Sequence, residues 1–240
     1  MLATRPATAR FISHKLAVRF VGDNPPQRLV DRLAKSYLSS GGEISAVLKT
    51  LFHSPEFWAP GAYRAKVKTP LEFVVSAARA SNATTDNLQP LVNALRDMGM
   101  PLYGAVPPTG YNWQSSTWVS TGALVNRMNF ALALAANRLP GIAVTWAAPK
   151  EASLSSDPAA EEERLESHLV AGGLSQPTRT AVLEQFQTQT AAQPAQAAAP
   201  MRAALVSAKP LNQAQAATAL EKQDQLLAGL LLGSPEFQRR

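Results

Sequence analysis

The 240-residue sequence has no cysteine and only three histidines, and these shortages exclude several kinds of chemistry. Without cysteine there is no disulfide, no thiolate nucleophile and no cysteine-ligated metal. His14, His53 and His168 are scattered, and no two of them have the short helical spacing of a paired metal site. We therefore expect no metal centre.

Long apolar runs are also missing. The longest, residues 130–136, is far shorter than the ~20 residues that cross a bilayer. Near the N-terminus, Arg5 and Arg10 interrupt the apolar residues that a signal peptide would need. We expect no transmembrane segment and no export signal within this chain, and the sequence alone leaves its localisation unknown.

Familiar catalytic signatures are absent as well. The sequence contains no nucleophile elbow, no phosphate-binding glycine loop and no dinucleotide fingerprint, so no cofactor is expected. Glu56 and Glu236 each follow a Ser-Pro pair, where an acid suits the start of a helix, and nothing predicts that these two carboxylates meet. The sequence leaves it uncertain whether the protein is an enzyme.

The net charge of +6 is unevenly distributed. Residues 1–150 carry about +9, whereas residues 151–240 carry about −3. The basic residues are dispersed at helix-surface spacing and accompany no groove-reading motif. We therefore do not expect nucleic-acid binding.

Prolines, glycines and capping residues divide the chain into amphipathic segments with helical spacing. Only residues 142–146 resemble a strand, and they are isolated. The predicted fold is all-α, a multi-helix bundle or array with one long ordered loop. The expected helices are 6–21, one opened by Asn24 and Pro25, 43–53, a restart at Ser54-Pro55-Glu56, 69–80, 86–98, 116–138, 157–171, 175–187 and 213–232.

Composition suggests two regions. Residues 1–148 are expected to form the main helical domain, and residues 149–240 a C-terminal helical region. An Ala/Gln/Pro-rich segment at 188–204 is interpreted as a linker or a frayed helix. A short repeat occurs once in each region, because Leu51-Phe-His-Ser-Pro-Glu-Phe57 recurs as Leu231-Leu-Gly-Ser-Pro-Glu-Phe237. Each copy is expected to form a helix–turn–helix corner.

The best candidate site is the loop at residues 99–115, which is too rich in glycine and proline for a helix. A loop of this length in a compact domain is often functional, and its aromatics argue against disorder. Aromatic planes with amide and cationic groups suit a sugar, a peptide or another flat ligand. The alternative is an Ω-loop that merely covers the core. The candidate ligand-binding residues are Tyr103, Tyr111, Asn112, Trp113, Trp118, Lys68, Arg127 and Asn129, with Lys66 nearby in sequence.

Several blocks of the chain together resemble the bacterial family called domain of unknown function 1800. They are residues 6–20, Ser54-Pro-Glu-Phe-Trp58, Val67-Lys-Thr-Pro-Leu-Glu-Phe73, Gly99-Met-Pro-Leu102, the loop 107–118, Thr121–Phe130 and Gly233–Arg240. The resemblance implies a C-terminal portion of a longer, exported protein whose other helical half lies upstream. The family pattern commonly has histidine before the first proline, where this chain has Arg5.

The resemblance implies no established activity. It does imply a partner of the domain of unknown function 1501 type, a sulfatase-like family, through gene neighbourhood alone. We expect a module that binds a partner protein or an envelope polymer. One alternative is part of a hydrolase-like enzyme, to which Lys68, Arg127 and Asn129 contribute while its other groups lie in the absent half. A second alternative is a truncated, nonfunctional copy.

Overall fold

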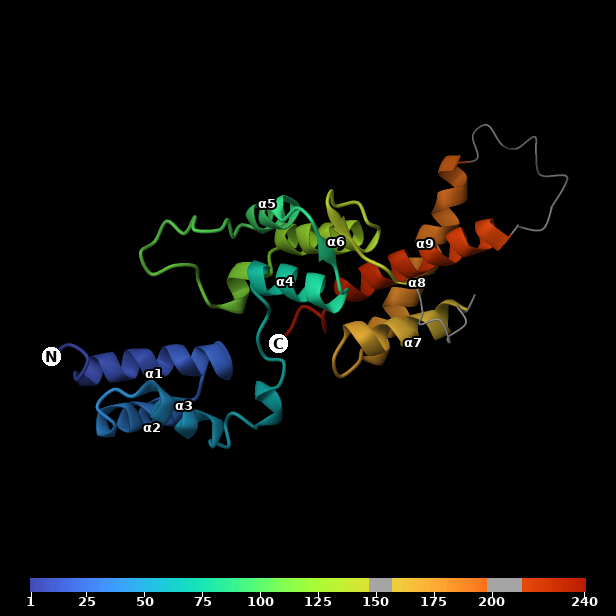
Figure 1. The fold of residues 1–240 in the computed structure, drawn as a ribbon. Coiled ribbons are helices and arrows are strands. Elements are labelled where there is room, and N and C mark those ends of the chain that lie inside the picture. The colour runs from blue at the N-terminus through green and yellow to red at the C-terminus, as the bar shows by residue number, and fades with distance from the viewer. Residues whose placement is uncertain (147–156, 198–212) are drawn as a thin grey trace, which may run out of the picture. The chain divides into compact units, whose positions relative to one another are not determined.

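A computed structural model describes residues 1–146, 157–197 and 213–240 and confirms the all-α fold (Figure 1). These described residues form nine α-helices, two short 3-10 helices and one two-stranded ribbon. None of the described helices is both long and apolar enough to cross a membrane. The helices are α1 (Pro6–Phe20), α2 (Gln27–Ser39), α3 (Ile44–Phe52), α4 (Pro70–Ala80), α5 (Gln89–Asp97), α6 (Thr121–Ala135), α7 (Pro158–Leu169), α8 (Gln176–Ala197) and α9 (Gln213–Leu232); the 3-10 helices are η1 (Pro60–Ala62) and η2 (Ser115–Trp118).

The chain divides into two compact units. The first contains residues 1–69, 105–120 and 239–240, and the second contains 70–104 and the described part of 121–238. Each unit is compact by itself, although it is assembled from separate stretches of the sequence. The domain division expected at residue 148 was inferred from composition, and it stays a prediction.

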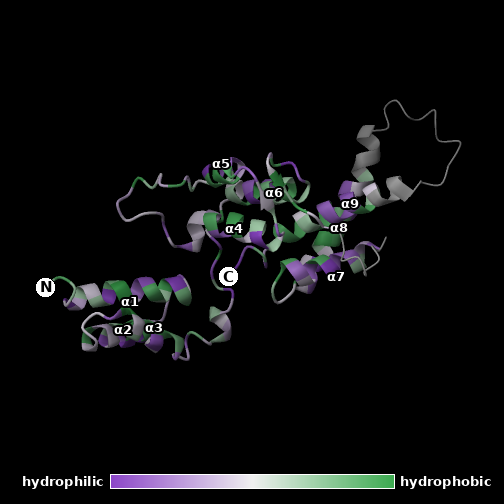
Figure 2. Cartoon of the chain, viewed as in Figure 1, coloured by the Kyte–Doolittle hydropathy of each residue, from purple (hydrophilic) through white to green (hydrophobic). Residues whose placement is uncertain are grey.

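The first unit is built on α1, α2 and α3, which pack side by side (Figure 1). Hydrophilic and hydrophobic residues alternate along these helices, as amphipathic helices require (Figure 2). Their apolar faces meet in a core that includes Leu29, Leu33, Val47 and Leu51. The chain end closes this unit, because the backbone of Arg240 pairs with the backbone of Lys66 through two hydrogen bonds of 2.9 and 3.4 Å.

The second unit is organised around α9, which packs against both α6 and α7. Phe73 of α4 makes edge-to-face contacts with Phe130 of α6 and with Phe237, each at 6.0 Å between ring centroids. At the α6–α9 contact, a Cβ on Gly229 would lie 2.8 Å from Cδ2 and 3.1 Å from Cα of Leu132. A glycine is therefore needed for α9 to approach α6 this closely.

The isolated strand candidate finds a partner far away in sequence. β2 (Ile142–Ala143) pairs antiparallel with β1 (Thr84–Thr85). Two side chains fix the segment that follows: Asn137 exchanges hydrogen bonds with the backbone of Val144, and Nε1 of Trp146 donates to the carbonyl of Ala135 at 2.7 Å. Residues 142–146 thus fold back over the end of α6.

Both Ser-Pro-Glu segments are tight turns, so the helix restart predicted at Ser54 is wrong. Oγ of Ser54 donates to the Leu51 carbonyl at 2.6 Å, which caps the end of α3 instead of opening a new helix. The carboxylate of Glu56 then forms ion pairs with Arg28 and Arg32 of α2, at 3.0 and 2.5 Å. In the second copy, Glu236 accepts hydrogen bonds from Ser175 and Thr178 at the start of α8. Each glutamate therefore fastens its turn to another helix.

Several helix boundaries also differ from expectation. α2 begins at Gln27 rather than Pro25, and α5 begins at Gln89, where Asn87 Oδ1 accepts from the backbone N–H. The helix expected at 116–138 is shorter, because η2 and a break precede α6. By contrast α8 extends to Ala197, so the first part of the Ala/Gln/Pro-rich segment is helical, while 198–204 lies outside the described residues.

Candidate functional site

The aromatic loop is anchored in the first unit by Trp118. This side chain is only 4% exposed, its Nε1 donates to the Asn112 carbonyl at 3.1 Å, and Tyr111 contacts it edge to face at 6.2 Å. Trp113 behaves differently, because 42% of it is exposed. The loop therefore combines one buried anchor with one accessible ring.

A buried lysine fixes the accessible part of the loop. Nζ of Lys66 forms an ion pair with Asp23 and donates to the Trp113 carbonyl at 2.7 Å. Asp23 also accepts from the Ser115 backbone at 2.9 Å, and Ser115 Oγ accepts from the Val67 backbone at 3.2 Å. Burial raises the pKa of Asp23, but the hydrogen bonds from Lys66 and Ser115 and the Lys66 charge outweigh it and hold that pKa below its usual value.

Beside this anchor lies a cleft of about 370 Å³, which we name the aromatic–arginine cleft. Among the residues that the structure describes, none that lines it is acidic. The two most accessible of its rings are Trp58, 74% exposed, and Tyr63, 70% exposed. Its aromatic and cationic lining consists of Phe20, Phe57, Trp58 and Tyr63 with Arg19, Arg64, Lys66 and Arg240.

The Trp58 ring is held in place despite its exposure. Nε1 of Trp58 donates to the Phe52 carbonyl at 2.8 Å, and its ring meets Phe57 edge to face at 5.2 Å. Phe57 in turn contacts Phe52, which contacts Phe20, at 5.1 and 5.3 Å between centroids. A fixed ring loses little conformational entropy when a ligand stacks on it.

Two arginines of the cleft lie over aromatic rings. The Arg19 guanidinium is 5.1 Å from the Trp113 ring centroid, and that of Arg64 is 5.4 Å from Tyr63. Arg64 has a positive φ of 52°, an uncommon backbone conformation for a non-glycine residue that is often found at functional sites. The cleft is therefore cationic and bounded by planar surfaces.

Family comparison covers almost the entire chain. The family model described as "Protein of unknown function (DUF1800)" matches residues 1–239. The chain belongs to the DUF1800 family. No curated protein and no solved structure matches this DUF1800 chain, so its site is argued from geometry alone.

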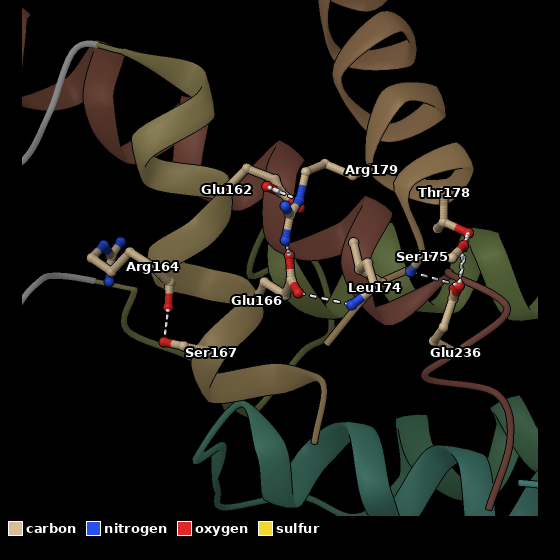
Figure 3. A network of polar contacts seen from close by, with 9 residues as sticks. All are labelled: Glu162, Arg164, Glu166, Ser167, Leu174, Ser175, Thr178, Arg179 and Glu236. Atoms are coloured by element: carbon tan, nitrogen blue, oxygen red, sulfur yellow. Dashed lines mark hydrogen bonds and ion pairs between the residues drawn. The ribbon is translucent and has the colours of Figure 1, made fainter. Parts of the chain in front are cut away.

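The second unit of the DUF1800 chain contains a buried carboxylate network, and Figure 3 shows its part between α7 and α8. Arg179 pairs with Glu166 at 2.5 Å and with Glu162 at 3.4 Å, and Glu166 also accepts from the Leu174 backbone at 2.8 Å. Burial, reinforced by the Glu166 charge, raises the pKa of Glu162 to about 7. For Glu166, hydrogen bonds from Arg179 and Leu174 outweigh the effect of burial and lower the pKa.

A second part of this network lies nearby. Arg164 pairs with Glu161 and with Asp224 of α9, the latter at 3.1 Å. Burial and the Glu161 charge raise the pKa of Asp224 to about 6 despite Arg164. Strongly shifted carboxyl pKa values often mark active sites, but these carboxylates are at most 6% exposed and offer no surface to a substrate. We assign them to helix packing.

The structure distributes the predicted site residues over both units. Tyr111, Asn112, Trp113, Trp118 and Lys68 belong to the first unit, with Lys68 half-buried.

The other three belong to the second unit. Tyr103 is fully exposed, and Asn129 is exposed on α6. Arg127 is fully buried, with its guanidinium 5.1 Å from the Phe73 ring centroid. Burial lowers the pKa of Arg127 to about 10, although the Glu72 charge opposes this shift. Arg127 thus has the surroundings of a core residue, and the role predicted for these residues in binding stays a prediction.

Sequence reasoning did not identify the cleft. Trp58 and Tyr63 follow a predicted helix start, and Arg19 ends another helix, so nothing in their spacing brings them together. The available signal was the density of aromatic and basic residues between 57 and 68, a range that includes Lys66.

Proposed function

We propose that this DUF1800 chain is a binding module whose aromatic–arginine cleft takes an anionic envelope polymer built of ring-shaped units, such as an acidic polysaccharide. The observation that supports this most directly is the exposure of two aromatic rings, Trp58 and Tyr63, among cationic side chains. Sugar rings present apolar faces that pack on aromatic planes. Guanidinium groups bind carboxylates through paired, charge-assisted hydrogen bonds.

The size of the aromatic contribution follows from exposed area. A tryptophan offers up to about 250 Å², of which a stacked ring covers about a third, so ~80 Å² at ~25 cal/mol per Å² gives about 2 kcal/mol. Trp58→Ala is therefore expected to weaken binding about 20- to 30-fold. Arg64→Gln removes one charge from the cleft and should weaken binding while reducing its dependence on salt.

The test is isothermal titration calorimetry with hexameric oligogalacturonate and with its uncharged methyl ester. The proposal expects the acidic form to bind more tightly than the ester and Trp58→Ala to lose most of this affinity. Tyr103→Ala provides a control, because Tyr103 is an exposed aromatic ring outside the cleft. Equal binding of both oligomers would refute the preference for an anionic polymer. A loss caused by Tyr103→Ala and not by Trp58→Ala would refute the cleft and favour the loop.

Two neighbouring hypotheses have their own readouts. The hydrolase-like alternative expects shortened oligomers after incubation, which chromatography of the same samples detects. A partner of the domain of unknown function 1501 type is expected to co-purify with the chain and to be released by the acidic oligomer if it occupies the same cleft.

A further inference from the structure

The helices α5 and α6 of the second unit are adjacent (Figure 1). They border a cleft of about 620 Å³ that is also lined by Asn87 and residues 139–140, and its lining differs chemically from that of the aromatic–arginine cleft. Its polar groups are five amides and one carboxylate. Its apolar wall includes Pro90, Leu139, Pro140 and the buried Phe130. Of the residues that the structure describes, no lysine or arginine lines it. The polar set is Asn87, Gln89, Asn93, Asp97, Asn126 and Asn129.

Helical spacing explains why these groups face one another. Gln89, Asn93 and Asp97 recur every four residues on α5, so they form one row along a single face. Asn126 and Asn129 are three residues apart on α6 and form a second row. Both rows border the same cleft.

Part of the hydrogen-bonding capacity of these rows is already used. Nε2 of Gln89 donates to Oδ1 of Asn93 at 2.9 Å, and Nδ2 of Asn126 donates to the Asp97 carbonyl at 2.7 Å. These bonds fix the amide planes and leave Nδ2 of Asn93 and Oδ1 of Asn126 available. The amide of Asn129 makes no hydrogen bond to another described residue, and it offers both a donor and an acceptor.

We propose that this cleft, the amide cleft, binds a neutral oligosaccharide. A sugar hydroxyl both donates and accepts, so neighbouring hydroxyls match alternating amide donors and carbonyl or carboxylate acceptors. The apolar wall suits the C–H face of the ring. The Asp97 carboxylate and the absence of described cationic groups in the lining disfavour an anionic ligand. An extended peptide is a poorer match, because peptides are usually held by backbone pairing at a sheet edge or by side-chain pockets.

This inference is independent of the proposed function, because it concerns another cleft, another unit and an uncharged ligand. Cellohexaose, chitohexaose and maltohexaose are titrated into the full chain with isotope-labelled side-chain amides, observed by NMR. At least one sugar should shift the Asn93 and Asn129 amide signals in a saturable manner below about 5 mM. Asn129→Leu keeps the number of side-chain heavy atoms and their branching, removes the amide, and should weaken binding about fivefold.

Gln114→Leu is the matched control, since Gln114 is an exposed amide outside this cleft. No saturable shift with any of the three sugars overturns the proposal, as does equal affinity in Asn129→Leu and the unmodified chain. Saturable binding of a neutral hexapeptide at the same amides, with no sugar response, would identify a peptide site instead and also overturn it.

Discussion

Replacing Glu162 with glutamine should stabilise the second unit at alkaline pH and change little at acidic pH. Glu162 is 1% exposed, and burial together with the Glu166 charge raises its pKa from 4.5 to about 7. The folded chain therefore binds this proton more tightly than the unfolded chain. The resulting stabilisation is fully present below about pH 4.5 and is lost as the pH rises through 7.

The magnitude follows from the same shift. A difference of about 2.5 pKa units corresponds to about 3 kcal/mol between the two protonation states. This is an upper bound, because Arg179 at 3.4 Å relaxes toward an ionised Glu162. At pH 8 Glu162→Gln should therefore raise the free energy of unfolding by about 1 to 3 kcal/mol. At pH 4.5 the protonated acid and the amide are nearly equivalent, so the gain in the free energy of unfolding should shrink to a few tenths of a kcal/mol.

Glu166, in the same network, should have the opposite effect on the pH dependence of stability. Its pKa is lowered, mainly by the hydrogen bonds from Arg179 and Leu174 that outweigh burial. Its stabilising contribution is present above the pKa that Glu166 has in the unfolded chain, and it is lost as the pH falls through the pKa in the folded chain. Glu166→Gln should therefore destabilise the chain at pH 8, where Glu162→Gln stabilises it.

Urea unfolding followed by circular dichroism at pH 4.5, 6 and 8 measures both effects. Glu184→Gln is the control, because Glu184 is exposed on α8 and lies outside the network. The reasoning fails if Glu162→Gln gives the same change at all three pH values, or if it lowers stability at pH 8.

Two further substitutions probe packing and the loop. Gly229→Ala places a methyl group against the Leu132 backbone, so despite the better helix propensity of alanine it should cost about 1 to 2 kcal/mol in urea unfolding. Gly122→Ala is the control, because a Cβ there would meet nothing within 4 Å, and it should be neutral or stabilise slightly. Equal effects of Gly229→Ala and Gly122→Ala on stability would contradict the α6–α9 contact. Lys66→Met removes the ion-pair partner of the partly buried Asp23 carboxylate, and should cost about 2 kcal/mol and increase amide hydrogen exchange around Trp113. Unchanged exchange there would show that the lysine does not hold the loop.

The two inferred clefts differ in the charge of the residues that line them. The aromatic–arginine cleft combines exposed rings with cations, whereas the amide cleft is uncharged except for Asp97. Screening by salt should therefore weaken the first interaction strongly and the second hardly at all. The same titrations at about 0.1 and 1 M salt distinguish the two clefts.

Local signals in the sequence determined most of the helices. Pro6 opens α1, Asp157 caps α7 through the Ala159 N–H at 3.1 Å, and Gly99 follows α5 with a φ of 83°. Such caps act within four or five residues, so they are readable without knowledge of the fold. The same local rule failed at Ser54-Pro55-Glu56. There Arg28 and Arg32 of α2 form ion pairs with Glu56, and these pairs stabilise a turn instead of a helix start.

The tertiary structure decided which distant residues share a surface. Residues 19, 58 and 63 line one cleft, and residues 93 and 129 line another, although nothing in their spacing links them. It also separated the aromatic loop into a buried anchor, Trp118, and an exposed ring, Trp113. The sequence by itself determined where helices form, since propensity and capping are local; burial and pairing depend on contacts between residues far apart in the chain, and only the folded structure supplies those.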